Sequence, residues 1–217
     1  MRNGTTTSLR VFLVEDHPVM RLGLKMMLRV RGFDVCGEAG SAQELVEALA
    51  DIDADIAIFD LSLNGETAFE LLGQVRARYP RLGMIVYSMH DAQMFVEKAL
   101  RVGVNGYVTK ADPVETLIEA IEAVRNGKRY LGPALTKTLE ERVSNQGGAG
   151  VALDELSDRE MEVLTFLGQG FGRGEIAERL SLSARTIETF FDRLKAKLGV
   201  RNNRELVREA IRIIHPG

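Results

Sequence analysis

The stretch that sets the fold is Ile56-Ala57-Ile58-Phe59-Asp60, four apolar residues followed by a carboxylate. A run this short, rich in β-branched and aromatic residues, is typical of a strand buried on both faces of a sheet. Similar runs occur on either side of it. Together they predict five strands: Val11–Val14, Val35–Cys36, Ile56–Phe59, Met84–Tyr87 and Gly106–Val108.

Amphipathic stretches separate these strands and predict helices. The helices expected are Pro18–Arg31, Ala42–Ala50, Thr67–Tyr79, Ala92–Val102 and Pro113–Asn126. Proline is tolerated in a first helical turn and glycine often follows a helix end, which suits these boundaries. Five strand–helix repeats indicate a doubly wound α/β fold with a parallel sheet, in which chemistry collects at the carboxyl ends of the strands.

The composition changes after residue 143. Ser144–Gly150 is small and polar, as flexible linkers are, and Pro133–Val143 before it predicts a short helix. No strand pattern follows, and four helices are expected: Asp158–Gly168, Glu175–Leu180, Ala184–Leu198 and Asn203–Ile214. We therefore expect an α/β domain at 8–130, a partly helical and then flexible linker at 131–153, and an all-α domain at 154–217.

Composition narrows the class of protein. A hydrophobic content of 45% and a charged content of 27% are ordinary for a globular protein. No apolar run approaches the roughly 18 residues that span a bilayer, and Met1–Ser8 lacks an apolar signal core, so we expect a cytoplasmic protein without membrane contact. Cys36 is the only cysteine. It cannot form an internal disulfide, and we expect it to be a small buried strand residue.

Charge is distributed unevenly. The net charge of the chain is −3, which by itself argues weakly against nucleic acid as a partner. However, Arg185–Arg212 contains eight Lys or Arg residues against four Asp or Glu residues. A basic surface near the C-terminus is therefore plausible.

Polar side chains follow four of the predicted strands. Glu15 and Asp16 follow the first strand, Asp60 the third, Ser88 the fourth and Lys110 the fifth. We expect the parallel sheet to place the first and third strands side by side, so that the three carboxylates converge. They would repel one another unless a cation such as Mg²⁺ binds. An ionised aspartate can attack phosphorus to give an acyl phosphate, and a lysine and a hydroxyl can hold the phosphoryl oxygens. Taken singly, each acid has the simpler explanation of a helix N-cap.

These positions resemble the receiver domains of response regulators, which have a flavodoxin-like five-stranded fold. The matching stretches are Val11–Asp16, Ile56–Asp60, Val86–Ser88 and Gly106–Lys110. The resemblance implies that Asp60 accepts a phosphoryl group and that Mg²⁺ is its cofactor. It also implies that the metal ligands are Glu15, Asp16, Asp60 and the backbone carbonyl of Ser62. The residues that respond to phosphate would be Ser88, Tyr107 and Lys110.

The chain departs from the family pattern at several places. Glu15 stands where the family often has Asp, and the loop Leu61–Ala68 lacks the usual Met, Pro and Gly residues. Ala111 replaces a proline whose peptide bond is cis in the family. A cis Lys110–Ala111 bond would cost about 3–4 kcal/mol more than trans, and the sequence leaves the isomer open. His17 and His90 flank the site, but neither has a second His or Cys at ligand spacing, so neither is assigned to a metal.

The C-terminal half carries a second resemblance. Ser157 and Glu160 have the spacing of a capping box, and short amphipathic helices follow. Leu156–Val200 resembles the LuxR-type helix-turn-helix of the NarL/FixJ family, in which the third helix enters the major groove. The resemblance implies that base edges meet Arg185, Glu188, Thr189 and Asp192, whereas DNA phosphates meet Arg193, Lys195 and Lys197. The simpler explanation for each is a solvated helix face.

Some residues of this half depart from the family or leave a choice open. Phe190 replaces a usual His, and Gly174 weakens the start of the second helix by up to about 1 kcal/mol relative to Ala. The apolar residues of Asn203–Ile214 suit either a dimer contact or packing inside the domain.

The two resemblances together imply a transcriptional regulator of a two-component system. A sensor histidine kinase would phosphorylate Asp60 with Mg²⁺, and the protein would bind double-stranded DNA as a homodimer. It would not be an enzyme, apart from self-phosphorylation and self-dephosphorylation at Asp60. The altered loop after Asp60 also allows a phosphorylation-independent DNA-binding regulator whose receiver is a protein-interaction module. Hydrolysis of an external phosphoester is a third interpretation, for which the sequence offers neither a second base nor a substrate cleft.

Overall fold

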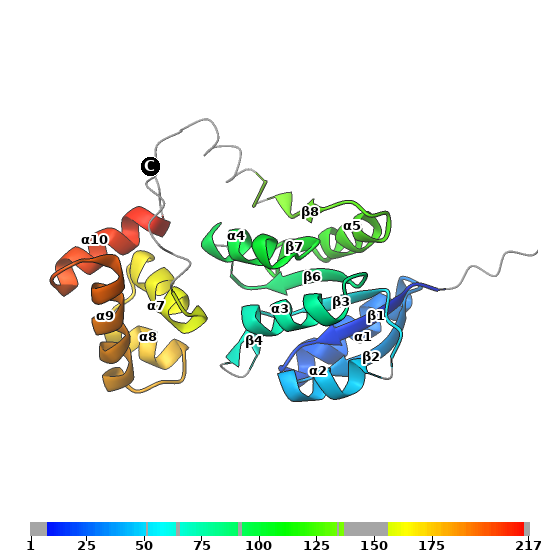
Figure 1. Cartoon of the computed structure of the whole chain (residues 1–217), viewed down its shortest axis with the longest axis horizontal. Coiled ribbons are helices and arrows are strands. Elements are labelled where there is room, and N and C mark those ends of the chain that lie inside the picture. Colours follow the sequence, from blue (N-terminus) through cyan, green and yellow to red (C-terminus); the bar gives the residue numbers. More distant parts are fainter. Residues whose placement is uncertain are drawn as a thin grey trace, which may run out of the picture. The chain divides into compact units, whose positions relative to one another are not determined.

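The chain divides into two compact units. The first contains a parallel sheet with helices on both faces and is called the sheet domain (Figure 1). The second is called the helical domain, and its described residues 156–214 contain the helices α7 to α10. The structure is a computed structural model, and it describes residues 8–50, 52–63, 66–90, 93–133, 135–136 and 156–214.

The sheet has the order β2-β1-β3-β6-β7-β8, and every neighbouring pair in it is parallel. Its strands are β1 (Arg10–Val14), β2 (Asp34–Ala39), β3 (Ile56–Phe59), β6 (Gly83–Ser88), β7 (Gly106–Thr109) and β8 (Tyr130–Leu131). The predicted doubly wound parallel sheet is confirmed. The edge strand β8 was not predicted, because two residues are too few to give a periodic pattern.

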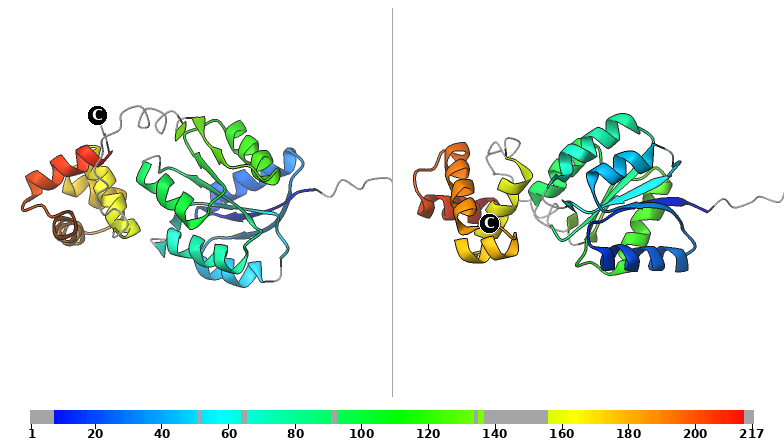
Figure 2. Two further views of the ribbon diagram at one scale, coloured as in Figure 1. Left: turned by 45° about the horizontal axis from the view of Figure 1, so that its top comes forward. Right: turned by 90° about the horizontal axis from the view of Figure 1, so that it is seen from below.

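In the described part of the sheet domain, five helices flank the sheet. They are α1 (Pro18–Val30), α2 (Ala42–Leu49), α3 (Ala68–Arg78), α4 (Gln93–Val102) and α5 (Val114–Arg125). All begin and end within one residue of the predicted positions. Pro18 occupies the first turn of α1, and the Ser41 side chain caps α2 by accepting a hydrogen bond from the Glu44 backbone N–H at 3.2 Å. Helices α1 and α5 lie on one face of the sheet and α2 and α3 on the other (Figure 2).

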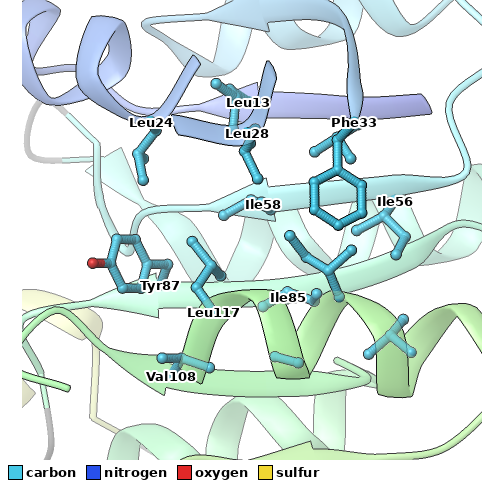
Figure 3. Packing of buried hydrophobic residues seen from close by; sticks show 14 of the residues in the cluster. Leu13, Leu24, Leu28, Phe33, Ile56, Ile58, Ile85, Tyr87, Val108 and Leu117 are labelled. Atoms are coloured by element: carbon cyan, nitrogen blue, oxygen red, sulfur yellow. The ribbon is translucent and has the colours of Figure 1, made fainter. Parts of the chain in front are cut away.

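One apolar core lies between the sheet and the helices α1 and α5 (Figure 3). Leu28 of α1 and Leu117 of α5 are fully buried against strand residues such as Ile58 and Ile85. Complete burial of such a side chain contributes about 1.5–3 kcal/mol. This packing holds the strands rigidly, so the residues at their carboxyl ends have fixed positions relative to one another.

The loop after β3 contains two further short strands. β4 (Ser62–Leu63) pairs antiparallel with β5 (Glu66–Thr67), and α3 follows directly. This pairing was not predicted, and Thr67 lies in β5 rather than in the helix. Cys36 lies in β2 as expected but is half-buried, and its thiol donates to the Val11 carbonyl oxygen at 3.4 Å.

The helical domain contains the four predicted helices. They are α7 (Asp158–Gly168), α8 (Arg173–Arg179), α9 (Ala184–Leu198) and α10 (Asn203–Ile214). Helix α8 begins two residues earlier than predicted, because the Glu175 carboxylate accepts from the Gly172 N–H at 2.7 Å and caps the first turn. Of the helix predicted at 133–143, only Pro133, Leu135 and Thr136 are described, and they are helical. The predicted flexible segment 144–150 lies outside the described residues.

The start of α7 is held by a capping box, as predicted. The Ser157 hydroxyl accepts from the Glu160 N–H at 3.3 Å, and the Glu160 carboxylate accepts from the Ser157 N–H at 2.8 Å. The Lys197 ammonium near the end of α9 donates to the same carboxylate at 2.6 Å. Burial would raise the pKa of Glu160, but the bonds from Lys197 and Ser157 outweigh it, so its pKa lies below the ordinary value.

The depressed pKa of Glu160 makes the stability of the helical domain depend on pH. A carboxyl whose pKa falls on folding stabilises the fold above its unfolded pKa of about 4.3, and that contribution disappears as the pH falls through the folded pKa. We expect Glu160→Gln to cost up to about 2 kcal/mol at pH 7 and to flatten the acid side of the stability profile. Urea unfolding of wild type and variant between about pH 6 and pH 3 measures this. Parallel profiles would contradict the prediction.

Two glycines around the start of α8 give a matched pair of substitutions. Gly174 lies inside α8 and Gly170 precedes it at a φ of +92°, and a Cβ atom built at either would have no heavy atom within 4 Å. We expect Gly174→Ala to stabilise the helical domain by up to about 1 kcal/mol, because alanine has the higher helix propensity. We expect Gly170→Ala to destabilise it by about 1–2 kcal/mol, because its backbone is left-handed. Thermal unfolding of the full chain compares them, and shifts of the same sign would contradict the prediction.

Candidate functional site

Four strand ends meet at one edge of the sheet. Strand β3 pairs with β1 on one side and with β6 on the other, and β6 pairs with β7. The predicted adjacency of the first and third strands is therefore confirmed. The residues that this arrangement brings to one edge are Glu15, Asp16, Asp60, Ser88 and Lys110.

Lys110 bridges two of the carboxylates. Its Nζ lies 2.8 Å from Glu15 Oε2 and 2.6 Å from Asp60 Oδ2, and the three side chains are at most 6% exposed. Burial alone would lower the pKa of Lys110, but the carboxylates of Asp60 and Glu15 outweigh it and raise that pKa. The site thus places the Lys110 ammonium group beside Asp60. Such a charge attracts the oxygens of a phosphoryl group.

The acidic part of the site consists of three carboxylates, those of Asp60, Glu15 and Asp16. Asp60 Oδ1 accepts from the Ser62 N–H at 3.1 Å, so the start of β4 orients this carboxylate. Glu15 Oε1 accepts from the His17 N–H at 3.2 Å, and the Arg21 guanidinium donates to the Glu15 carbonyl oxygen at 2.5 Å. The donor set of three carboxylates is the hard oxygen chemistry that suits Mg²⁺. Coordination by the Ser62 carbonyl stays a prediction.

Ser88 and Tyr107 contact the same peptide. The Ser88 hydroxyl accepts from the His90 N–H at 3.2 Å, and the Tyr107 hydroxyl donates to the His90 carbonyl oxygen at 2.6 Å. Both side chains are fully buried. They therefore connect the strand ends to the loop before α4. The Lys110–Ala111 bond is trans, as is every other peptide bond in the described part of the chain.

In the helical domain, α9 presents one polar face. Ile187, Phe191 and Leu194 form its buried face. On the other side lie four of the residues predicted to contact DNA, and all four are exposed: Arg185, Thr189, Asp192 and Arg193. A hollow of about 300 Å³ on this face is lined by Ser183, Arg185, Thr186, Thr189, Phe190 and Arg193.

Some of the residues predicted to contact DNA form ion pairs within the helical domain. Glu188 pairs with Arg173 of α8 at 2.8 Å, and Lys195 pairs with Asp192 at 2.9 Å. Lys197 pairs with Glu160, and this structural role competes with the predicted contact of Lys197 to phosphate. Sequence reasoning missed Arg173, because no spacing rule links it to Glu188, which lies on another helix.

The apolar residues of α10 pack mainly inside the helical domain. Leu206 and Ala210 are fully buried, whereas Ile211 is 44% exposed. Of the two expectations for this helix, packing inside its own domain accounts for these buried residues. Within the described ranges, no helix has the length and apolar character needed to cross a bilayer.

Comparisons with known proteins match both domains. The family model for the response regulator receiver domain matches residues 11–122, and that for bacterial regulatory proteins of the luxR family matches 154–210. The chain belongs to the response regulators with a LuxR-type DNA-binding domain. Transcriptional activator protein ExaE of Pseudomonas putida is 34% identical over 204 residues, covering 93% of this chain and 95% of that protein. Oxygen regulatory protein NreC of Staphylococcus carnosus is 30% identical over 211 residues, covering 94% and 97%.

Solved structures of related response regulators are similar to this chain over nearly its whole length. The RcsB response regulator of Salmonella typhimurium has a TM-score of 0.60 at 27% identity, covering 93% of this chain and 97% of that chain. A structure of an RcsB–DNA complex has a TM-score of 0.60 at 26% identity, covering 96% and 100%. The protein is thus a DNA-binding transcriptional regulator of a two-component system, as the sequence predicted.

Proposed function

We propose that Asp60 is the phosphoryl acceptor of this response regulator and that a sensor histidine kinase is the donor. The observation that carries the proposal is the buried bridge from Lys110 to both Glu15 and Asp60. One oxygen of Asp60 attacks phosphorus, the bond from phosphorus to the donor breaks, and an acyl phosphate remains. The Lys110 ammonium then pairs with a phosphoryl oxygen. Self-phosphorylation from small donors and self-dephosphorylation are the only chemical steps that we assign to the protein.

The cation proposed for this site is Mg²⁺, held by Glu15, Asp16, Asp60 and the carbonyl of Ser62. When bound, it would neutralise charge on the carboxylates and on the transferred phosphoryl group. Three carboxylates and one ammonium leave a formal charge of −2 at the site, which favours a divalent cation. Glu15 uses Oε2 for Lys110, and its Oε1 lies on the side of Asp16 and His17.

Phosphorylation is proposed to act on the His90 peptide. A phosphoryl group brings a charge of about −1.5 to −2 and strong acceptor oxygens. We expect the Ser88 side chain to rotate so that its hydroxyl donates to one of these oxygens, and this rotation would break the bond that Ser88 accepts from the His90 N–H. Tyr107 holds the carbonyl of the same residue, so its ring responds to any movement of that peptide. The change in the loop before α4 then shifts the population of DNA-binding states.

We propose that the output is binding of double-stranded DNA by a homodimer through α9. Arg185, Glu188, Thr189 and Asp192 would face base edges, and Arg193, Lys195 and Lys197 would face phosphates. The exposure of Arg185, Thr189 and Arg193 supports this assignment. A two-fold dimer places two copies of α9 on one DNA duplex, which compensates for the repulsion between Asp192 and phosphate.

The test combines mass spectrometry with DNA selection. The full chain is incubated with phosphoramidate and Mg²⁺, reduced with borohydride and digested, and the modified residue is mapped. DNA sequences are then selected with and without the phosphodonor. We expect modification at Asp60 and tighter DNA binding after phosphorylation. Modification elsewhere would contradict the assignment of Asp60. Modification at Asp60 without any effect on DNA binding would instead favour a phosphorylation-independent regulator.

A further inference from the structure

A large aromatic side chain of α9 lies at the surface rather than in the core. Phe190 is half-buried, whereas its neighbour Phe191 belongs to the buried face of the helix. Phe190 lines the hollow of about 300 Å³ on α9 together with Thr186 and Thr189. We propose that this hollow takes the 5-methyl group of a thymine, so that Phe190 determines part of the DNA sequence that the protein prefers. The inference deepens the proposed function, because it rests on contact between α9 and DNA.

The helical repeat explains why these side chains meet. Residues four apart on a helix are neighbours on its surface, so Thr186 lies next to Phe190, and Thr189 lies next to Arg193. All four line the same hollow. The buried face of α9 already packs against the rest of the helical domain without Phe190. Its ring is therefore available for a contact outside the domain.

The two threonines make the hollow less polar than their residue type suggests. The Thr189 hydroxyl donates to the Arg185 carbonyl oxygen at 3.2 Å, and the Thr186 hydroxyl lies 2.8 Å from the Ser183 hydroxyl. Because both hydroxyls are bonded within the first turns of α9, a ligand in the hollow contacts the methyl groups of the threonines and the Phe190 ring. Such an apolar surface suits the 5-methyl group, which is the apolar group that thymine presents in the major groove.

A cationic group stands beside this apolar surface. The Arg193 guanidinium lies over the Phe190 ring, 5.9 Å from the ring centroid, and the Arg193 side chain is exposed. A guanidinium is attracted to the face of an aromatic ring, so the two side chains orient each other. The 5-methyl group of thymine lies at the edge of the major groove, close to the phosphates of its own strand. An apolar hollow with an arginine at its rim therefore matches a thymine and its neighbouring phosphate together.

Replacement of thymine by deoxyuridine isolates the proposed contact. This change removes the 5-methyl group and leaves the base pair and its hydrogen-bonding groups in place. Burial of one methyl group corresponds to roughly a three- to fivefold gain in affinity. A loss of this size at one position, and its dependence on Phe190, is what the proposal predicts.

The test uses the full chain with the phosphodonor present and the DNA sequence that it selects. Each thymine of that sequence is replaced in turn by deoxyuridine, and fluorescence anisotropy at a fixed salt concentration gives the affinities. The variants are Phe190→Ala, Phe190→His and the matched control Phe171→Ala. Phe171 is also half-buried beneath an arginine, with the Arg179 guanidinium 4.0 Å from its ring centroid, but it precedes α8. Thermal unfolding shows which variants are folded, and Phe190→His retains a ring if Phe190→Ala does not fold.

We expect at least one thymine at which wild type and Phe171→Ala lose about three- to fivefold in affinity on replacement. At that position the loss should fall below about twofold in the folded Phe190 variants. Equal affinity of wild type for every duplex, or a selected sequence without thymine, would overturn the proposal. A full loss that persists in the Phe190 variants would assign the methyl contact to another residue and would also overturn it. If Arg185→Ala and Arg193→Ala bind DNA as wild type does, the proposed contact of α9 with DNA fails as well.

Discussion

Replacement of Asp60 by asparagine is expected to reduce labelling by a small phosphodonor to less than about 1% of the wild-type level. The amide has nearly the same volume as the carboxylate, so the buried site keeps its shape. It lacks the charged oxygen that attacks phosphorus and that pairs with the Lys110 ammonium at 2.6 Å in the native site. Labelling with phosphoramidate, followed by intact-mass spectrometry, measures the effect.

The matched control for Asp60→Asn is Asp112→Asn. Asp112 Oδ2 accepts from the Thr109 N–H at 3.1 Å and from the Thr109 hydroxyl at 2.8 Å, and an asparagine oxygen can accept both bonds. We expect this variant to be labelled like wild type, because Asp112 takes no part in the Lys110 bridge. Substantial labelling of Asp60→Asn under the same conditions would show that the acceptor is another residue.

The substitution Gly168→Ala is expected to destabilise the helical domain strongly. A Cβ atom at Gly168 would lie 2.7 Å from the Ala210 carbonyl oxygen and 2.6 Å from Ile214 Cγ1. The Ile214 side chain can turn away, but the carbonyl belongs to the backbone of α10, so α7 and α10 must move apart. Overpacking of this kind costs about 1–3 kcal/mol. Each kcal/mol lowers the Tm of a domain of this size by roughly 4–8 °C.

Gly174→Ala is the control here, because it makes the same change in a helix of the same domain where a Cβ has open space. Thermal unfolding of both variants, followed by circular dichroism, separates crowding from helix propensity. We expect a lower Tm for Gly168→Ala and an equal or higher Tm for Gly174→Ala. Equal values for Gly168→Ala and wild type would mean that α10 packs less closely on α7 than the structure shows.

The fold was largely predictable because its signals are local. The run Ile56–Phe59 is apolar and short, and Asp60 marks its end, so the strand and its boundary follow from five residues. The helices were predictable for the same reason, since Ser157 and Glu160 set the start of α7 by themselves. The strands β4, β5 and β8 were missed because each has two residues and depends on a partner strand for its conformation.

The site was predictable only in its residue types. Strand order indicated that Glu15, Asp60 and Lys110 would meet, but only the structure shows Lys110 bonded to both acids. The contact of the His17 ring nitrogen with the Asp16 carboxylate at 2.9 Å was not predicted either, because the order of residues does not fix the direction of a ring. The pair of Lys197 with Glu160 joins residues 37 positions apart, which no periodic pattern reveals.

That pair has a consequence for how the protein recognises DNA. Lys197 joins the last turn of α9 to the first turn of α7, while Ile187, Phe191 and Leu194 fix the rest of α9 from below. The orientation of α9, which we propose contacts DNA, is therefore set within the domain before DNA binds, and we expect little conformational entropy to be lost on binding. The heat-capacity change measured on DNA binding should then reflect only the surface buried between the protein and the DNA. Differences in promoter occupancy would then arise from how many helical domains bind the DNA together in an oligomer, rather than from folding of each domain on the DNA.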